Sequence, residues 1–137
     1  MAFWLLKTEP STYSFGDLRR EGRARWDGVA NPQALANLRA MKAGDRALVY
    51  HTGDERAAVG EAQVIREAYP DPAGKDPRLV VVDLQAGAPL MRPVALETLK
   101  GEAAFAGSPL LKQGRLSVVP LTEAQWRAVE RLSRREP

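Results

Sequence analysis

The order of apolar and polar residues along the chain predicts a series of short β-strands. Short runs of β-branched, aromatic and other apolar residues, bounded by turn-forming residues, are typical of strands in a packed sheet. Five strands are expected, or six if the shortest run also pairs. The runs are Phe3–Lys7, Ala24–Trp26, Arg46–His51, Ala57–Arg66, Leu79–Leu84 and Leu116–Pro120.

Capping residues between these runs predict three or four helices. Ser14 followed by Asp17 is a capping pattern for a short helix. Asn31 before Pro32 marks a second helix start, because Asn caps well and Pro suits the first helical position. The expected helices lie between Ser14 and Gly22, from Pro32 to near Gly44, over Val94–Lys100, and from Thr122 to about Arg134. The segments Tyr69–Pro77 and Ser108–Leu111 are expected to be loops.

These elements predict a single domain of mixed α/β (α+β) class over residues 1–137. The chain has the length of one domain, and no repeat or long linker divides it. Several strands follow one another without intervening helices, so a doubly wound parallel sheet is disfavoured. A curled, mostly antiparallel sheet of five or six strands surrounded by helices fits the order better.

The residue inventory excludes several kinds of chemistry. Without cysteine the chain has no disulfide, zinc knuckle or thiol nucleophile. Its one histidine, His51, excludes metal sites built on several histidines, and no metal or cofactor is expected. The sequence contains neither a glycine-rich dinucleotide motif nor a P-loop. A hydrolase triad would have to use His51 as its base, and no GxSxG motif accompanies it.

Charge and hydropathy place weaker limits on the protein. The net charge is +3, which is compatible with a nucleic-acid partner but does not require one. Four arginines, Arg19, Arg20, Arg23 and Arg25, lie close together and form either a phosphate-binding patch or an ordinary solvated face. The apolar N-terminal run is too short for a signal peptide or a membrane span, so a cytoplasmic protein without membrane contact is expected.

Three segments, taken together, resemble the EVE domain family. They are Trp4–Pro10 with Tyr13–Phe15, Trp26–Ala34 running on through Met41–Asp45 to Tyr50–Gly53, and Ser108–Lys112 with Arg115–Val118 and Pro120–Thr122. The resemblance implies a PUA-like pseudo-barrel that holds a flipped, modified base in an aromatic and polar cage, modified cytosine in DNA above all. The chain departs from the family pattern in two places. Thr52 stands where Ser is common, and Ala30 stands where many members carry a basic residue.

The residues and the resemblance together nominate a set of ligand-binding positions. Aromatic rings can stack on a base, while amide, hydroxyl and backbone groups can read its edge. The loop at Ser108 would add backbone donors and an apolar slot. The candidates are Trp4, Lys7, Thr8, Trp26, Asn31, Tyr50, His51, Thr52, Ser108, Pro109 and Leu110.

Several candidates have an equally ordinary structural role. Trp4 lies in an apolar strand and is suited to the core, Asn31 is suited to capping a helix, and a lone His51 is often structural. Strand alternation also puts Tyr50 and His51 on opposite faces unless the strand ends or bulges there. Phe3, Phe15, Phe105 and Trp126 are expected in the core or in helix packing.

The function predicted from the sequence is a non-catalytic reader of a modified base in DNA or RNA. The base would be flipped into a cavity expected between the side chains of Trp4, Trp26 and Tyr50. Two alternatives remain open: an enzyme that acts on a modified base or nucleotide with Asp27 or His51 as acid–base group, and a protein-interaction module.

Overall fold

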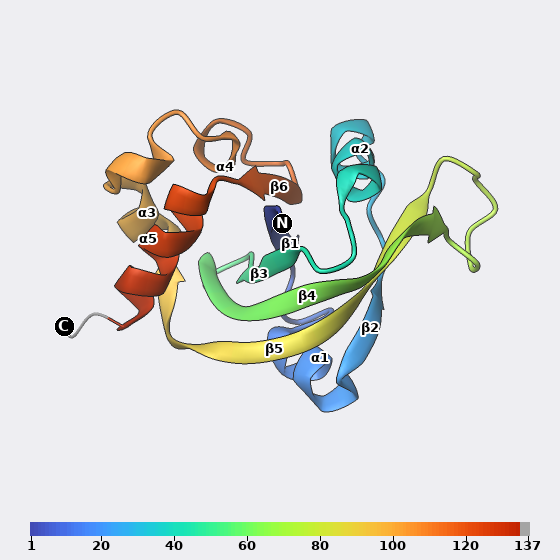
Figure 1. Ribbon diagram of the computed structural model, residues 1–137, viewed down its shortest axis with the longest axis horizontal. Helices are drawn as coiled ribbons and strands as arrows, with labels where there is room; N and C mark the ends of the chain where they lie inside the picture. Colours follow the sequence, from blue (N-terminus) through green and yellow to red (C-terminus); the bar gives the residue numbers. More distant parts are fainter. Residues whose placement is uncertain (135–137) are drawn as a thin grey trace.

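A curled six-stranded sheet with helices packed around it makes up the protein (Figure 1). The computed structural model describes residues 1–134, so the last three residues of the predicted 1–137 domain lie outside the described part. The strands are β1 (Phe3–Thr8), β2 (Arg23–Trp26), β3 (Arg46–His51), β4 (Ala57–Pro70), β5 (Val80–Ala95) and β6 (Val118–Leu121). The helices are α1 (Phe15–Glu21), α2 (Pro32–Ala40), α3 (Leu96–Lys100), α4 (Pro109–Lys112), α5 (Glu123–Arg134) and a 3₁₀ turn, Ala103–Phe105.

The sheet is mostly antiparallel, which confirms the predicted mixed α+β class. Its strand order is β2-β5-β4-β3-β1-β6, and the one parallel pair is β1 with β3. Within residues 1–134, β2 and β6 are the two edges, so the sheet curls without closing into a barrel. The ribbon of β4 and β5 crosses the molecule, while α3, α4 and α5 gather at the end opposite its tip (Figure 1).

The largest difference from the sequence prediction is the length of β4 and β5. Four register shifts interrupt their pairing, and each shift bends the ribbon and absorbs residues that break a regular strand pattern. The predicted helix Val94–Lys100 therefore begins only at Leu96, because Val94 and Ala95 pair with β4. The expected loop at Ser108 is also different: it forms the short helix α4, which begins at Pro109. This raises the number of α-helices in residues 1–134 to five, above the three or four expected.

The predicted helix caps are confirmed. Ser14 and Asp17 form a reciprocal capping box at α1. The Asn31 side chain accepts a hydrogen bond from the backbone N–H of Ala34, and Thr122 and Gln125 cap α5 in the same reciprocal manner as Ser14 and Asp17. Each cap satisfies N–H groups that the first helical turn leaves unpaired.

The core lies between the sheet and the helices and contains the aromatic residues expected there. Phe105 and Trp126 are fully buried, Phe15 is nearly so, and Phe3 packs 4.9 Å from the Trp126 ring, measured between centroids. Among residues 1–134, none of the helices combines the length and apolar character needed to cross a membrane.

A close contact between Phe15 and Gly60 joins α1 to the sheet. A Cβ atom added at Gly60 would lie 2.2 Å from the end of the Phe15 ring, so any larger residue would displace the ring. The backbone N–H of Phe15 also donates to His51 Nε2 at 2.9 Å. Two contacts at one residue thus fix where α1, and the loop before it, lie on the sheet.

Gly60→Ala is therefore expected to destabilise the protein by about 1–3 kcal/mol, the usual range for an overpacked core. Urea unfolding followed by circular dichroism measures the change. Gly16→Ala is the matched control, because its Cβ would meet only the Ser14 hydroxyl at 3.4 Å in an exposed helical position. The control should be neutral or stabilising. Equal stability of Gly60→Ala and the parent chain would contradict the close packing.

Candidate functional site

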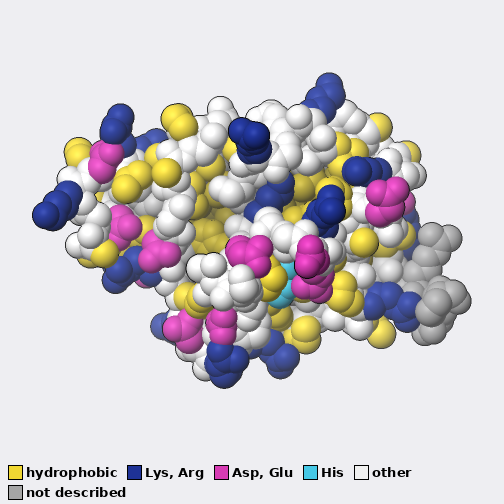
Figure 2. Space-filling view, turned by 180° about the vertical axis from the view of Figure 1, so that it is seen from behind, with side chains coloured by type: hydrophobic (Ala, Val, Ile, Leu, Met, Phe, Trp, Pro, Cys, Tyr) yellow, Lys and Arg dark blue, Asp and Glu magenta, His cyan; other side chains and the backbone are white. Residues whose placement is uncertain are grey.

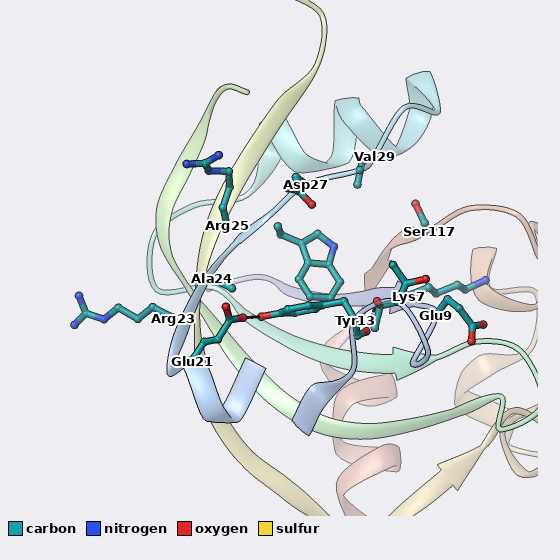
Figure 3. Close-up of a pocket in the computed structure, with 14 residues that line it drawn as sticks. Lys7, Glu9, Tyr13, Glu21, Arg23, Ala24, Arg25, Asp27, Val29 and Ser117 are labelled. Atoms are coloured by element: carbon teal, nitrogen blue, oxygen red, sulfur yellow. Dashed lines mark hydrogen bonds between the residues drawn. The ribbon is translucent and has the colours of Figure 1, made fainter. Parts of the chain in front are cut away.

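A pocket of about 730 Å³ opens where the end of β1, the loop before α1 and the segment around β2 meet (Figure 3). This volume lies within the range of roughly 300–1,000 Å³ that small-molecule sites occupy. The lining residues come from two stretches, 7–13 and 21–29, and from Ser117, which is distant in the sequence. Its lining includes Lys7, Thr8, Tyr13, Trp26, Asp27 and Ser117.

Two aromatic rings contribute to the apolar part of the pocket. Tyr13 and Trp26 meet edge to face, with 6.1 Å between ring centroids and 79° between planes. Trp26 is only 6% exposed, and the exposed part belongs to the pocket lining. Such an aromatic pair offers a rigid apolar surface against which a planar ring can pack.

Hydrogen bonds hold the Tyr13 side chain and backbone in place. The phenol donates to the Glu21 carboxylate, drawn as a dashed line in Figure 3, and Thr8 Oγ1 donates to the Tyr13 carbonyl at 2.6 Å. Burial, together with the Glu21 bond and charge, raises the pKa of Tyr13 far above its ordinary value. The ring therefore stays a neutral phenol at physiological pH.

The charged groups of the lining balance one another. Figure 3 shows Arg23 and Arg25 extending away on the β2 side and Lys7 on the opposite side. The lining contains three basic and three acidic residues, namely Lys7, Arg23, Arg25, Glu9, Glu21 and Asp27. A ligand that enters the pocket thus meets a polar but nearly neutral environment.

Lys7 is partly withdrawn from solvent. Its Nζ donates to the Gly114 carbonyl at 3.0 Å and lies 5.8 Å from the centre of the Tyr50 ring. Burial lowers the pKa of Lys7. Because an ammonium has three donors, the bond to Gly114 leaves others for a ligand.

Of the three rings around which the sequence places a cavity, Trp26 lines the pocket and the other two lie elsewhere. The Trp4 indole is buried and donates to Asp45 Oδ2 at 3.0 Å. Tyr50 is buried in β3, and burial raises its pKa. Both side chains are buried, and Tyr13 supplies the second ring of the pocket instead.

Three further candidates have structural contacts in place of pocket contacts. Asn31 caps α2. His51 accepts from the Phe15 N–H at Nε2, and its Nδ1 lies 2.7 Å from Glu55 Oε1. Thr52 Oγ1 donates to the Thr8 carbonyl and to Glu9. Figure 2 shows the histidine surrounded by acidic side chains, with Lys and Arg scattered over the same face.

The segment Ser108–Leu110 lies apart from the pocket. Ser108 and Leu110 are buried, and Pro109 starts α4. Within residues 1–134, the Ser108 hydroxyl is a buried group with no hydrogen-bond partner. Of the eleven candidate positions, Lys7, Thr8 and Trp26 line the pocket.

Tyr13, Ser117 and Glu21 line the pocket although the sequence does not mark them as site residues, and Asp27 is suggested by the sequence only as an acid–base group. One signal was present: Tyr13 lies between the first strand and the α1 cap at Ser14, and residues in such loops often contribute to binding sites. Ser117 and Glu21 carry no local signal, because they reach the pocket only through the tertiary fold. The structure also shows, over residues 1–134, no cluster of three or more acidic or histidine side chains suited to a metal ion.

Comparison with known proteins identifies close relatives of the whole chain. The family described as EVE domain matches residues 2–132. The chain is 35% identical to thymocyte nuclear protein 1 of Mus musculus, over 98% of this chain and 75% of that protein. The NMR structure of Rpa0253 from Rhodopseudomonas palustris superposes with a TM-score of 0.90 and 41% identity, covering 97% of this chain and 93% of that one.

A third relative has been solved with a ligand. The crystal structure of human THYN1 protein in complex with DNA containing 5-methylcytosine gives a TM-score of 0.89 and 32% identity, and the match covers 100% of both chains. The present chain therefore has the same overall fold as these two solved structures.

Asp45 should contribute a pH-dependent part of the stability. Burial alone would raise its pKa, but hydrogen bonds from the backbone of Ala2 and Lys42 and from the Trp4 indole outweigh it, so the pKa of Asp45 is lowered. A carboxyl whose pKa is lowered by folding stabilises the folded state at pH values above its unfolded-state pKa of about 4. This stabilisation is lost as the pH falls through the folded-state pKa. Asp45→Asn should therefore lower the free energy of unfolding at neutral pH by about 2 kcal/mol.

Urea unfolding of both proteins between about pH 7 and pH 3 measures this difference. The gap between the parent chain and Asp45→Asn should narrow as the pH falls. The exposed control Asp54→Asn should show a small gap throughout. A gap for Asp45→Asn that stays constant with pH would show that the carboxylate charge is not involved.

Proposed function

This chain belongs to the EVE domain family, and we propose that it is a non-catalytic protein that reads a modified base, 5-methylcytosine in DNA, by taking the flipped base into the Tyr13–Trp26 pocket. The alternative target in the same class is a modified base in RNA. The proposal includes Lys7 and Thr8 at the same pocket, as the sequence predicts, and leaves Trp4, Asn31, Tyr50 and His51 with structural roles.

The observation that carries the proposal is the edge-to-face aromatic pair inside a pocket of ligand size. A base taken out of a duplex loses pairing and stacking worth a few kcal/mol. Stacking on an aromatic side chain returns about 1–3 kcal/mol per base. A pocket with two fixed rings and a neutral polar rim suits this exchange better than it suits a phosphate or a metal ion.

The human THYN1 complex supports the identity of the ligand. That protein, with the same fold over its whole compared length, was crystallised with DNA containing 5-methylcytosine. The present chain shares 32% of its residues with it. Binding of 5-methylcytosine is therefore the first ligand to test.

The state of His51 supports a reader over an enzyme. A general base needs a ring nitrogen free to take a proton from the substrate. In this chain Nε2 accepts from the Phe15 backbone and Nδ1 contacts Glu55. His51 does not line the pocket. Its two nitrogens instead connect the end of β3 to the start of α1.

Arg23 and Arg25 are the cations best placed for the DNA backbone. Both are exposed on the edge strand β2 and line the pocket (Figure 3). Arg19 and Arg20 lie in the last turn of α1, and Arg20 is paired with Asp17. Because a flipped nucleotide stays attached to its phosphates, cations at the pocket rim are the natural contacts.

The predicted cytoplasmic location stays a prediction. The curated relatives carry the name thymocyte nuclear protein, which points to another compartment for those proteins.

Trp26→Leu should weaken binding of a 5-methylcytosine oligonucleotide by about tenfold or more, because stacking on one ring contributes about 1–3 kcal/mol. Tyr13→Leu, at a half-buried position that tolerates change better, should weaken it similarly. Fluorescence anisotropy with oligonucleotides that differ only in the 5-methyl group measures both. Trp4→Leu is the matched control: it should lower the melting temperature and leave the affinity of the folded protein unchanged. Full affinity in both pocket variants would refute the assignment of the pocket.

Replacing both Arg23 and Arg25 by Gln should make the plot of log binding constant against log salt concentration less steep. The slope should change by about 2, since each phosphate contact on B-DNA contributes about 0.9. Affinity should fall equally for methylated and unmethylated DNA, because phosphate contacts do not read the base. The control pair Lys100→Gln and Arg127→Gln removes the same charge from exposed positions on α3 and α5. A reduced slope in the control pair as well would assign the effect to net charge.

A further inference from the structure

A protein that binds 5-methylcytosine must also reject thymine, and an apolar slot for the methyl group cannot distinguish the two bases. Thymine carries the same 5-methyl group on the same pyrimidine ring and differs at positions 3 and 4. At position 4 cytosine has an amino donor and thymine a carbonyl acceptor, and at position 3 cytosine has an acceptor nitrogen and thymine an N–H donor. Apolar packing around the methyl group is therefore equal for both bases. Rejection of thymine needs a polar group aimed at position 3 or position 4 of the ring.

We propose that Asp27 is the specificity-determining residue of the pocket, and that its carboxylate accepts a hydrogen bond from the 4-amino group of the bound cytosine. The inference rests on the proposed function and names the contact that distinguishes 5-methylcytosine from thymine. A carboxylate accepts hydrogen bonds and donates none, so it matches cytosine and opposes the thymine carbonyl.

The placement of Asp27 supports this role. It lines the pocket directly after Trp26, and Figure 3 shows it across the pocket from Tyr13. Asp27 and Tyr13 both line this pocket. Gly28 adopts φ 79°, a conformation that favours glycine, and both of its neighbours, Asp27 and Val29, line the pocket.

Asp27 is also the pocket carboxylate that remains available. Glu21 accepts from the Tyr13 phenol, and Glu9 accepts from Ser11 and Thr52. Among the contacts of residues 1–134, Asp27 has neither a hydrogen bond nor an ion pair. Its oxygens are free to bind a ligand without breaking an existing bond.

Two polar side chains that the sequence nominates to read the base edge already take part in hydrogen bonds within the protein. Asn31 Oδ1 accepts from the Ala34 N–H, and Thr8 Oγ1 donates to the Tyr13 carbonyl. Lys7 keeps donors for the acceptors of the base, but an ammonium cannot accept from an amino group. Asp27 supplies the acceptor that Lys7 lacks.

The test uses single-stranded oligonucleotides that differ at one position, which is 5-methylcytosine, cytosine or thymine. Without a duplex, the cost of flipping does not differ between bases. The parent chain should bind 5-methylcytosine about ten- to a hundredfold more tightly than thymine, the range for one good polar base contact. Asp27→Asn, which can also donate, should bring the two affinities within about threefold and keep the preference for 5-methylcytosine over cytosine.

Asp54→Asn is the matched control, because it removes the same charge from an exposed turn outside the pocket lining. It should leave both base preferences unchanged. Three outcomes overturn the proposal, and they differ from one another. Equal binding of 5-methylcytosine and cytosine by the parent chain removes the proposed function together with the role of Asp27. Equal binding of 5-methylcytosine and thymine by the parent chain, or unchanged thymine rejection in Asp27→Asn, removes the role of Asp27 alone.

Discussion

The position of Phe15 on the sheet is the constraint on which the site depends. Its ring lies against Gly60, where a side chain would not fit, and its backbone N–H is bound by His51. These two contacts hold the start of α1. The loop that leads into α1 carries Tyr13, and the last residue of α1 is Glu21, which binds the Tyr13 phenol. One packed ring in the core thus determines where an aromatic side chain stands in the pocket.

The two buried tryptophans near the N-terminus show how similar residues acquire different roles. Both are less than 8% exposed. Trp4 lies in the interior strand β1, and its indole N–H donates to Asp45. The Asp45 carboxylate also accepts from the backbone N–H groups of Ala2 and Lys42. Trp26 lies at the end of the edge strand β2, where the chain leaves the sheet, and part of it borders the pocket. The difference comes from strand order and not from the residue type.

The balanced charge of the pocket rim has a consequence for recognition. A site with equal numbers of cations and carboxylates gains little from attraction to a polyanion, and the Lys and Arg side chains of the face in Figure 2 are scattered. In the proposed reader, aromatic packing and hydrogen bonding at the base therefore supply most of the selectivity. An unpaired carboxylate in such a site costs affinity for DNA in general and favours the base that can donate to it.

The sequence by itself determined the fold class and the positions of the six strands to within a few residues of at least one end. It also determined the helix caps at Ser14, Asn31 and Thr122. These features follow from local rules, since periodicity and capping act over a few neighbouring residues. It also placed Lys7, Thr8 and Trp26 at a site through resemblance. Only the tertiary structure decided the length of β4 and β5, the pairing of Tyr13 with Trp26, and the availability of Asp27 beside the engaged Asn31 and Thr8. The physical reason is that register shifts and side-chain partners depend on strands that meet in space from distant parts of the chain.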